Sequence, residues 1–208
     1  KGLLEQRKHK QIANLINKKN VSLLDVGCGG GTFIDICIEK GWKAQGVDPS
    51  PEAMSSHDAK IFNGDFNQMK FEKKYDVVTF WGVLEHLSEP ITAMRKAKDI
   101  LKKDGIMVYE VPSADCFTAQ YLKKYNFSPT RYIESGRHNI FFSRKLIEQV
   151  ANDLKLKVEL IESNGLDIQT ILLSEFDPNI TEKIINMQDV INDSLLGDHY
   201  RVFLKNSD

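Results

Sequence analysis

The sequence predicts an α/β protein built on a mostly parallel sheet that is covered by helices on both faces. Short apolar runs rich in β-branched residues alternate with helical patterns along the 208 residues, which is the order typical of such sheets. The length and the 41% hydrophobic content suit one domain of ordinary size with a full core. We therefore expect residues 1–208 to form a single domain.

The strands are predicted from apolar runs that end in turn residues. A strongly apolar run such as "YDVVTFW" suits a strand that is buried on both faces of the sheet. The expected strands, including two late ones, cover residues 21–26, 43–48, 59–65, 75–81, 106–111, 156–162 and 200–205.

The helices are predicted from apolar stripes and from residues that start or stop helices. Residues 1–20 form a weakly amphipathic lead-in helix, and its basic run "EQRKHK" is interpreted as a solvated face. Pro90 can begin a helix, and Ser143 can cap another. The first of these is expected to end in "KKDG". Further helical patterns cover residues 32–40, 49–56 and 184–195.

Composition excludes some classes of partner. The formal net charge of -1 provides no global basic field for a nucleic acid, so no nucleic-acid partner is expected. No apolar run approaches the roughly 18 residues that span a bilayer, and no secretory signal or membrane partner is expected. Cys28, Cys37 and Cys116 are scattered without a C-x-x-C pair, which favours a reducing compartment. We therefore expect a cytoplasmic protein.

Aromatic residues gather between residues 113 and 142, just beyond the fifth expected strand. In an open α/β sheet, ligands bind beyond the carboxyl ends of the strands. This aromatic-rich insert is therefore a candidate lid or substrate wall, although a helix that packs its aromatics on the core fits the pattern equally well. The aromatics are Phe117, Tyr121, Tyr125, Phe127, Tyr132, Phe141 and Phe142.

A glycine-rich turn in "SLLDVGCGGGTFIDI" joins the first strand to the first helix of the alternating pattern. Such a turn presents backbone N–H groups and the positive end of a helix dipole to a ligand. The dinucleotide fingerprint requires glycine at positions 27, 29 and 32, but residue 32 is threonine. The turn alone therefore indicates a nucleoside ligand without identifying it.

Two acidic residues follow the next two strands and narrow the choice. Asp48 in "GVDPS" lies at the distance where an acid accepts hydrogen bonds from ribose hydroxyls. Asp65 in "NGDF" can accept from the exocyclic amine of adenine, and Phe66 offers a face for the ring. Together with the glycine turn, they describe a pocket for one adenosine rather than for two nucleotides.

From residue 21 to about residue 154 the chain resembles class I S-adenosylmethionine-dependent methyltransferases. The motifs "LLDVGCGGG", "GVDPS", "NGDF", "YDVVTFWGVLEHLSEP" and "LKKDGIMVYEVPS" occur in the family's order. The resemblance is greatest to the branch with ubiquinone-biosynthesis-type O-methyltransferases. It implies a Rossmann-like, doubly wound sheet of seven strands, with the last strand antiparallel between the fifth and the sixth.

The resemblance also implies a binding site for S-adenosyl-L-methionine. Asp48, followed by Pro49, would hold the ribose hydroxyls, and Asp65 with Phe66 would hold the adenine. Trp81 and Gly82 would line the sulfonium end. The backbone of the glycine turn would face the methionine part and the ribose through Asp25, Gly27, Cys28, Gly29 and Gly31.

The chemistry implied is an in-line displacement, which depends on holding the acceptor close while excluding water. A hydroxyl acceptor benefits from a base, and His86 and His138 are the candidates. Glu85 has no second carboxylate at metal-ligand spacing, so no metal is expected, and Glu110 is a weaker pocket candidate. The remaining histidines, expected at the surface, are His9, His57 and His199.

The sequence thus predicts a methyltransferase that acts on a small molecule, with O-methylation favoured and the oligomeric state left open. A non-catalytic S-adenosylmethionine-binding module is the alternative, which would bind the cofactor without turnover. A nicotinamide-dependent oxidoreductase is disfavoured by Thr32 and Asp65. A nucleic-acid methyltransferase is disfavoured by the neutral charge balance.

Overall fold

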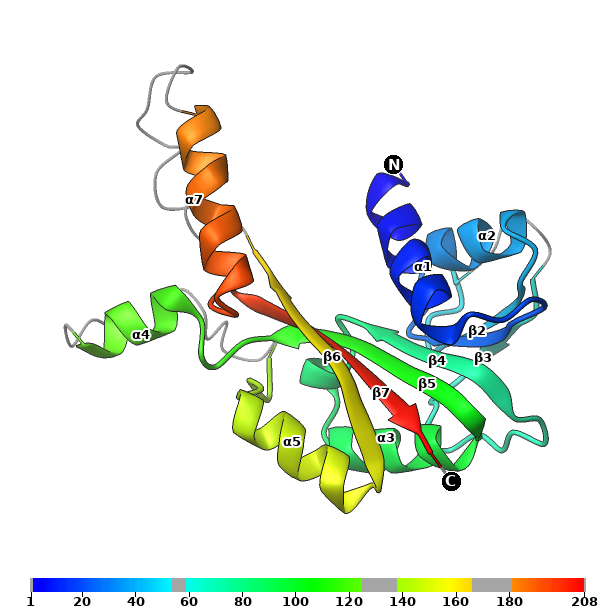
Figure 1. Ribbon diagram of the computed structural model, residues 1–208. Coiled ribbons are helices and arrows are strands. Elements are labelled where there is room, and N and C mark those ends of the chain that lie inside the picture. The colour runs from blue at the N-terminus through cyan, green and yellow to red at the C-terminus, as the bar shows by residue number, and fades with distance from the viewer. Residues whose placement is uncertain (1, 54–58, 125–137, 166–180, 208) are drawn as a thin grey trace.

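A seven-stranded sheet forms the centre of the protein (Figure 1). The computed structural model describes residues 2–53, 59–124, 138–165 and 181–207. Within these residues the strand order is β3-β2-β1-β4-β5-β7-β6. The strands are β1 (Ser22–Val26), β2 (Lys43–Asp48), β3 (Ile61–Asn63), β4 (Tyr75–Trp81), β5 (Leu101–Pro112), β6 (Leu156–Asn164) and β7 (His199–Asn206).

The first five strands are parallel, and β7 is antiparallel to both of its neighbours, β5 and β6. This arrangement confirms the predicted Rossmann-like sheet with an antiparallel last strand between the fifth and sixth. The strand order reverses between β1 and β4. A crevice forms at the carboxyl ends of strands at such a point, and ligands bind there.

Helices cover both faces of the sheet. In Figure 1, α1 and α2 lie on one side, α3 and α5 lie on the other, and α4 and α7 extend past the end of the sheet. None of the described helices is both long and apolar enough to cross a membrane. The helices are α1 (Leu3–Ile16), α2 (Thr32–Glu39), α3 (Pro90–Asp99), α4 (Phe117–Lys124), α5 (Arg144–Asp153) and α7 (Thr181–Asp193), with a 3-10 turn η1 (Leu84–His86).

Each face of the sheet has its own core because alternate strand residues point to opposite sides. Val78 and Phe80 of β4 join the core under α3 and α5. Val77 of β4 and Val108 of β5 join the core under α1 and α2. The apolar runs in the sequence are explained by this burial on both sides.

Some predicted boundaries differ from the structure. The helix from Pro90 ends at Asp99, and β5 already begins at Leu101, where the sequence pattern predicted helix up to residue 105. Leu101 pairs with Tyr75, but the next pair is Val77 with Ile106, so the register of the two strands shifts there. The "KKDG" segment forms the irregular part of β5 at this shift. Of the short helix expected over 49–56, residues 54–58 lie outside the described residues.

Candidate active site

The glycine turn leaves β1 in a conformation that ordinary side chains rarely adopt. Gly27, Gly29 and Gly31 have φ angles of 72°, 46° and 68°, which L-residues disfavour. The backbone N–H of Gly27 donates to the carbonyl of Val47 at 2.7 Å and ties the turn to β2. A Cβ added at Gly29 would meet no described atom within 4 Å, so this part of the main chain borders open space.

Asp48 at the end of β2 fixes the turn from the other side. Its Oδ2 accepts from the backbone N–H of Gly29, and its Oδ1 accepts from that of Ser50, both at 2.8 Å. An ionised carboxylate offers about four acceptor positions, so about two are left for the hydroxyls of a ribose. The predicted role of Asp48 is therefore compatible with its buried position.

A cavity of about 700 Å³ lies at the carboxyl ends of β1, β2 and β4, a size that holds a small ligand. It also borders Asn139, which lies in the C-terminal part of the aromatic-rich insert. The cavity brings together many of the residues predicted to bind the cofactor or the acceptor: Gly27, Asp48, Pro49, Asp65, Phe66, Gly82 and His86.

The loop after β3 forms one wall of this cavity. Asp65 is exposed, and its Oδ1 accepts from the backbone N–H of Asn67 at 2.8 Å. Phe66 is buried, with its ring 5.8 Å from that of Phe80. The ammonium of Lys96 on α3 donates to the carbonyl of Phe66 and holds the loop in place.

The other predicted residues do not line this cavity. Asp25 is buried and accepts a hydrogen bond from Thr79 at 2.6 Å, and burial raises the pKa of its carboxyl to about 7. Burial raises the pKa of the Cys28 thiol to about 12, so this thiol is poorly reactive. Gly29, Gly31, Trp81 and His138 also lie outside the lining.

Trp81 ends β4 on the face that carries α1. The ammonium of Lys8 lies 4.3 Å from the centre of the indole, and the guanidinium carbon of Arg201 lies 5.6 Å from it. The indole Nε1 is buried without a hydrogen-bond partner among the described residues. An unsatisfied buried donor costs about 1–3 kcal/mol, so an acceptor group of a ligand would be favoured beside it.

The basic run in α1 is not a fully solvated face, contrary to the sequence interpretation. Lys8 is buried against Trp81, and His9 is buried with its ring 4.3 Å from that of Trp42. His9 was predicted at the surface, and that prediction is wrong because α1 packs its basic positions onto the sheet and α2. His57 lies outside the described residues.

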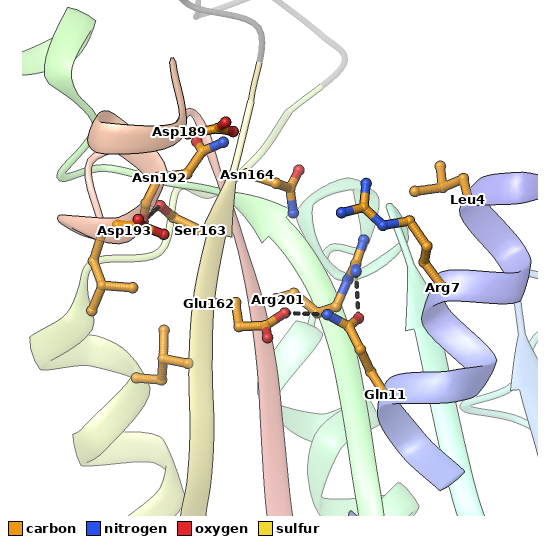
Figure 2. Close-up of a pocket in the computed structure, with 12 residues that line it drawn as sticks. Leu4, Arg7, Gln11, Glu162, Ser163, Asn164, Asp189, Asn192, Asp193 and Arg201 are labelled. Atoms are coloured by element: carbon orange, nitrogen blue, oxygen red, sulfur yellow. Dashed lines mark hydrogen bonds between the residues drawn. The ribbon is translucent and has the colours of Figure 1, made fainter. Parts of the chain in front are cut away.

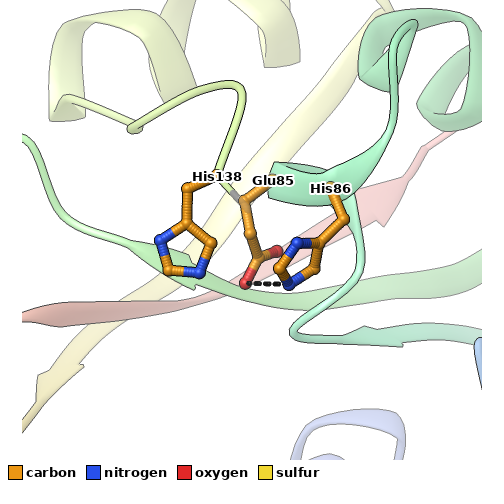
Figure 3. A group of neighbouring side chains, drawn as sticks. All are labelled: Glu85, His86 and His138. Carbon is orange, nitrogen blue, oxygen red and sulfur yellow. Dashed lines mark ion pairs between the residues drawn. The ribbon is translucent and has the colours of Figure 1, made fainter. Parts of the chain in front are cut away.

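Glu85, His86 and His138 form a cluster that the sequence pattern did not predict (Figure 3). Glu85 is buried, desolvation raises the pKa of its carboxyl, and its Oε1 lies 3.9 Å from Nε2 of His86. The rings of His86 and His138 are 5.0 Å apart. The ligand atoms of the three side chains all lie within 4.8 Å of one another, close enough for a shared proton or cation.

His138 reaches this cluster because the next residue, Asn139, packs on η1. The backbone N–H of Asn139 donates to the carbonyl of Glu85 at 2.7 Å, and the Asn139 side chain donates to the carbonyl of His86 at 3.0 Å. The segment that joins His138 to α4, residues 125–137, lies outside the described residues. Both predicted base candidates therefore lie together, beside the edge of the cavity.

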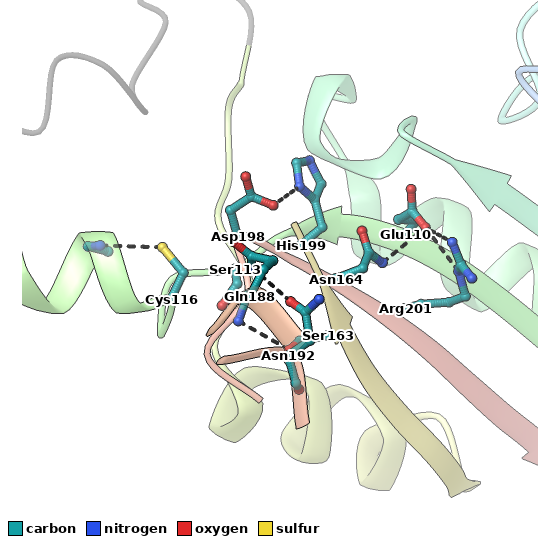
Figure 4. A network of polar contacts seen from close by, with 12 residues as sticks. Glu110, Ser113, Cys116, Ser163, Asn164, Gln188, Asn192, Asp198, His199 and Arg201 are labelled. Atoms are coloured by element: carbon teal, nitrogen blue, oxygen red, sulfur yellow. Dashed lines mark hydrogen bonds and ion pairs between the residues drawn. The ribbon is translucent and has the colours of Figure 1, made fainter. Parts of the chain in front are cut away.

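A row of polar residues crosses the sheet from Trp81. Trp81 pairs with Glu110, Glu110 with Arg201, and Arg201 with Glu162. Arg201 is buried, and its Nε donates to Glu110 at 2.9 Å while its Nη1 donates to Gln11 of α1 at 2.6 Å (Figure 4 shows the Glu110 pair). Glu110, a weaker candidate in the sequence, is thus the partner of a buried arginine.

Arg201 and Glu162 of this row line a polar cleft between α1, β6 and α7, which Figure 2 shows. The cleft has a volume of about 500 Å³. Its lining side chains come from the two ends of the sequence, from α1 and from the segments of β6, α7 and β7, so no local motif indicates the cleft. The polar side chains are Arg7, Gln11, Glu162, Ser163, Asn164, Asp189, Asn192, Asp193 and Arg201.

His199 also belongs to this region, and its side chain is 41% exposed, in keeping with the surface position that the sequence suggested. It begins β7, and its Nδ1 lies 2.7 Å from Oδ1 of Asp198 (Figure 4). That hydrogen bond raises the pKa of the His199 imidazole, although burial opposes the rise. The aspartate that precedes His199 in "GDHY" was the sequence feature that could have indicated this contact.

Comparison with known proteins links this architecture to one family. The family model described as "Methyltransferase domain" matches residues 3–160. A ubiquinone biosynthesis O-methyltransferase of Actinobacillus pleuropneumoniae is 30% identical over 115 residues, with 48% of each chain covered. One of Pelagibacter ubique is 29% identical over 101 residues, with 43% of this chain and 41% of the relative covered. The chain therefore spans about half the length of these curated relatives.

Solved structures share the fold over almost the whole chain. A SAM-dependent methyltransferase from Archaeoglobus fulgidus superposes with a TM-score of 0.63 at 20% identity, covering 98% of this chain and 93% of that one. A magnesium protoporphyrin IX methyltransferase from Synechocystis, solved with bound SAH, gives a TM-score of 0.64 at 14% identity, covering 98% and 84%. At these identities the likeness concerns the fold.

Proposed function

Because this chain belongs to the methyltransferase family, we propose that it transfers the methyl group of S-adenosyl-L-methionine to a hydroxyl of a small-molecule acceptor. The observation that carries the proposal is the cavity at the carboxyl ends of β1, β2 and β4. It joins the glycine turn to Asp48 and Phe66, which are the three parts of a single-adenosine pocket.

The residues present fit this cofactor. The main chain at Gly29 borders open space, so a ligand can approach it closely. Asp48 retains acceptor capacity for ribose hydroxyls, and Phe66 lines the same cavity as Asp65 for an adenine ring. When bound, S-adenosylmethionine supplies a methyl carbon that its sulfonium makes electrophilic.

Oxygen is the favoured acceptor atom because the matched curated relatives are named O-methyltransferases. A hydroxyl needs a proton acceptor within hydrogen-bond reach, and we assign His86 and His138 as candidates. A small molecule rather than a nucleic acid is proposed as the acceptor, in keeping with the net charge of -1. A cytoplasmic location is also proposed, because the three cysteines are buried thiols rather than disulfides.

Calorimetric titration with S-adenosylhomocysteine tests the cofactor site, and transfer of a labelled methyl group to catechol, to a monosaccharide and to an aromatic amine tests the activity. Asp48→Asn should weaken cofactor binding about 10- to 150-fold, since hydrogen bonds to a charged group are lost. Asp104→Asn removes an exposed acid remote from the cavity and serves as the control. Absence of cofactor binding by the wild-type protein would refute the proposal.

A further inference from the structure

The α1-facing side of the sheet carries a polar patch at the end of β5, formed by Glu110, Asn164, His199 and Arg201. His199 pairs with Pro112 and with Asn164, and Arg201 pairs with Glu110. Because residues two apart on a strand share a face, the His199 side chain lies on the same side as Arg201. The patch therefore continues the row that starts at Trp81.

The imidazole of His199 is held in one orientation. Its Nδ1 lies 2.7 Å from Oδ1 of Asp198, and the carbonyl of Asp198 accepts from the backbone N–H of Ser113 at 2.8 Å. A Cβ added at Gly165 would lie 2.4 Å from Oδ1 of Asp198, so this carboxylate packs directly on backbone. An imidazole that donates Nδ1–H to a carboxylate presents Nε2 as an acceptor.

The patch borders the polar cleft, because Asn164 and Arg201 line that cleft. Strand spacing places β7 about 10 Å from β4, because only β5 separates them. Glu85, which follows β4, interacts electrostatically with His199. On the other side, Asn164 lines the cleft and pairs with His199. A ligand in the cleft can therefore reach toward the end of β4 across His199.

The charges around His199 are mostly negative. Asp198 contributes most to raising the pKa of its imidazole, and Glu110 of β5 and Glu85 of η1 act in the same direction. The cations on this face include Arg201, which forms an ion pair with Glu110, and Lys8, which lies over the ring of Trp81. From β6 the facing partner is the neutral Asn164. Such surroundings favour a base that can take up a proton near neutral pH.

We propose that His199, held by Asp198, accepts the proton of a hydroxyl acceptor whose remaining part occupies the polar cleft. This inference rests on the proposed function. The acceptor oxygen forms the bond to the methyl carbon while the carbon–sulfur bond breaks with its electron pair on sulfur. The hydroxyl proton passes to Nε2 of His199, and the resulting imidazolium is balanced by the Asp198 carboxylate. In this proposal His199 replaces the two base candidates at the cavity edge, and His86 and His138 position the acceptor instead.

The test compares His199→Gln and Asp198→Asn with the control Asp104→Asn, which changes an exposed acid remote from the cavity. Methyl transfer to a panel of hydroxyl compounds, with catechol and a monosaccharide included, is followed between about pH 5 and pH 9. His199→Gln should lower kcat about 100-fold or more, the usual contribution of a base. It should leave the affinity for S-adenosylhomocysteine unchanged in calorimetry. Asp104→Asn should keep kcat within about threefold of the wild type, because Asp104 lines neither the cavity nor the cleft.

A second readout does not depend on turnover. NMR titration of the imidazole signals should place the pKa of His199 above the ordinary histidine value in the wild type, and Asp198→Asn should lower it. The acid limb of the pH–rate profile should move to lower pH in the same variant. This joint shift is not expected if the Asp198–His199 contact only stabilises the fold.

Three results would overturn the proposal. The first is a wild-type kcat in His199→Gln. The second is a His199 titration that Asp198→Asn does not change. The third is cofactor binding without methylation of any hydroxyl compound in the panel. Failure to bind the cofactor at all would refute the proposed function instead.

Discussion

Replacing Gly29 by alanine separates the role of the glycine turn in ligand binding from its role in folding. Gly29 has a φ of 46°, and Gly41 at the end of α2 has a φ of 84°. A Cβ at either position would meet no described atom within 4 Å. Both alanine variants therefore pay only for left-handed backbone, about 1–2 kcal/mol each in the free energy of unfolding.

The two variants differ in what the added methyl group meets once the cofactor is bound. Gly29 lies in the turn and donates its N–H to Asp48, whereas Gly41 lies at the far end of α2. Overpacking by one methyl group costs about 1–3 kcal/mol, which corresponds to about 5- to 150-fold in the Kd of S-adenosylhomocysteine. Gly41→Ala should leave this Kd unchanged.

Urea denaturation and calorimetric titration of both variants measure the two quantities on the same proteins. We expect similar losses of stability and a loss of affinity confined to Gly29→Ala. Equal affinities in the two variants, or an equal loss in both, would refute the assignment of the turn to the cofactor.

Three further predictions concern other parts of the molecule. Gly27→Ala should destabilise the fold by about 2–5 kcal/mol in urea denaturation. The strain of a left-handed backbone adds to overpacking, because the new Cβ would lie 2.5 Å from Cγ2 of Val83. A loss of stability no larger than that of Gly41→Ala would contradict this prediction. Burial raises the pKa of Asp76, but hydrogen bonds from Lys102, Lys18 and Ser22 outweigh burial and hold this pKa well below its usual range. The ionised Asp76 therefore stabilises the fold above the unfolded pKa of about 4, and this stabilisation is lost as the pH falls. In thermal denaturation, Asp76→Asn should therefore reduce the loss of stability that the wild type shows at acidic pH. An unchanged acid-induced loss would exclude the Asp76 network as its source. Arg7→Gln in the polar cleft should raise the KM for the acceptor several-fold, roughly the effect of one charge-assisted hydrogen bond, with kcat unchanged; an unchanged KM would place the acceptor elsewhere.

Much of the fold could be predicted because strand patterns and helix caps depend on residues that are close together in the sequence. The strand at residues 75–81 is apolar on both faces, and Ser143 caps α5 by accepting from the backbone N–H of Leu146. The glycine turn and Asp48 lie one strand apart in sequence and also in space, since β1 pairs with β2. Short-range order therefore sufficed to predict that Asp48 and Phe66 border one cavity.

The polar cleft could not be predicted in this way because its contacts join distant segments. Arg201 meets Glu110 only because β7 inserts beside β5, and Gln11 joins them because α1 packs across that face. The burial of Lys8 and His9 is likewise decided by tertiary packing, which overrides the solvated face that charge alone suggested.

A crystal structure with S-adenosylhomocysteine bound is the most direct test of the central claim. The account predicts the nucleoside in the cavity of about 700 Å³, with its ribose hydroxyls on Asp48 and its adenine between Asp65 and Phe66. The homocysteine end should point toward Trp81 and Gly82. A nucleoside bound in the polar cleft between α1 and α7, with this cavity empty, would contradict the account.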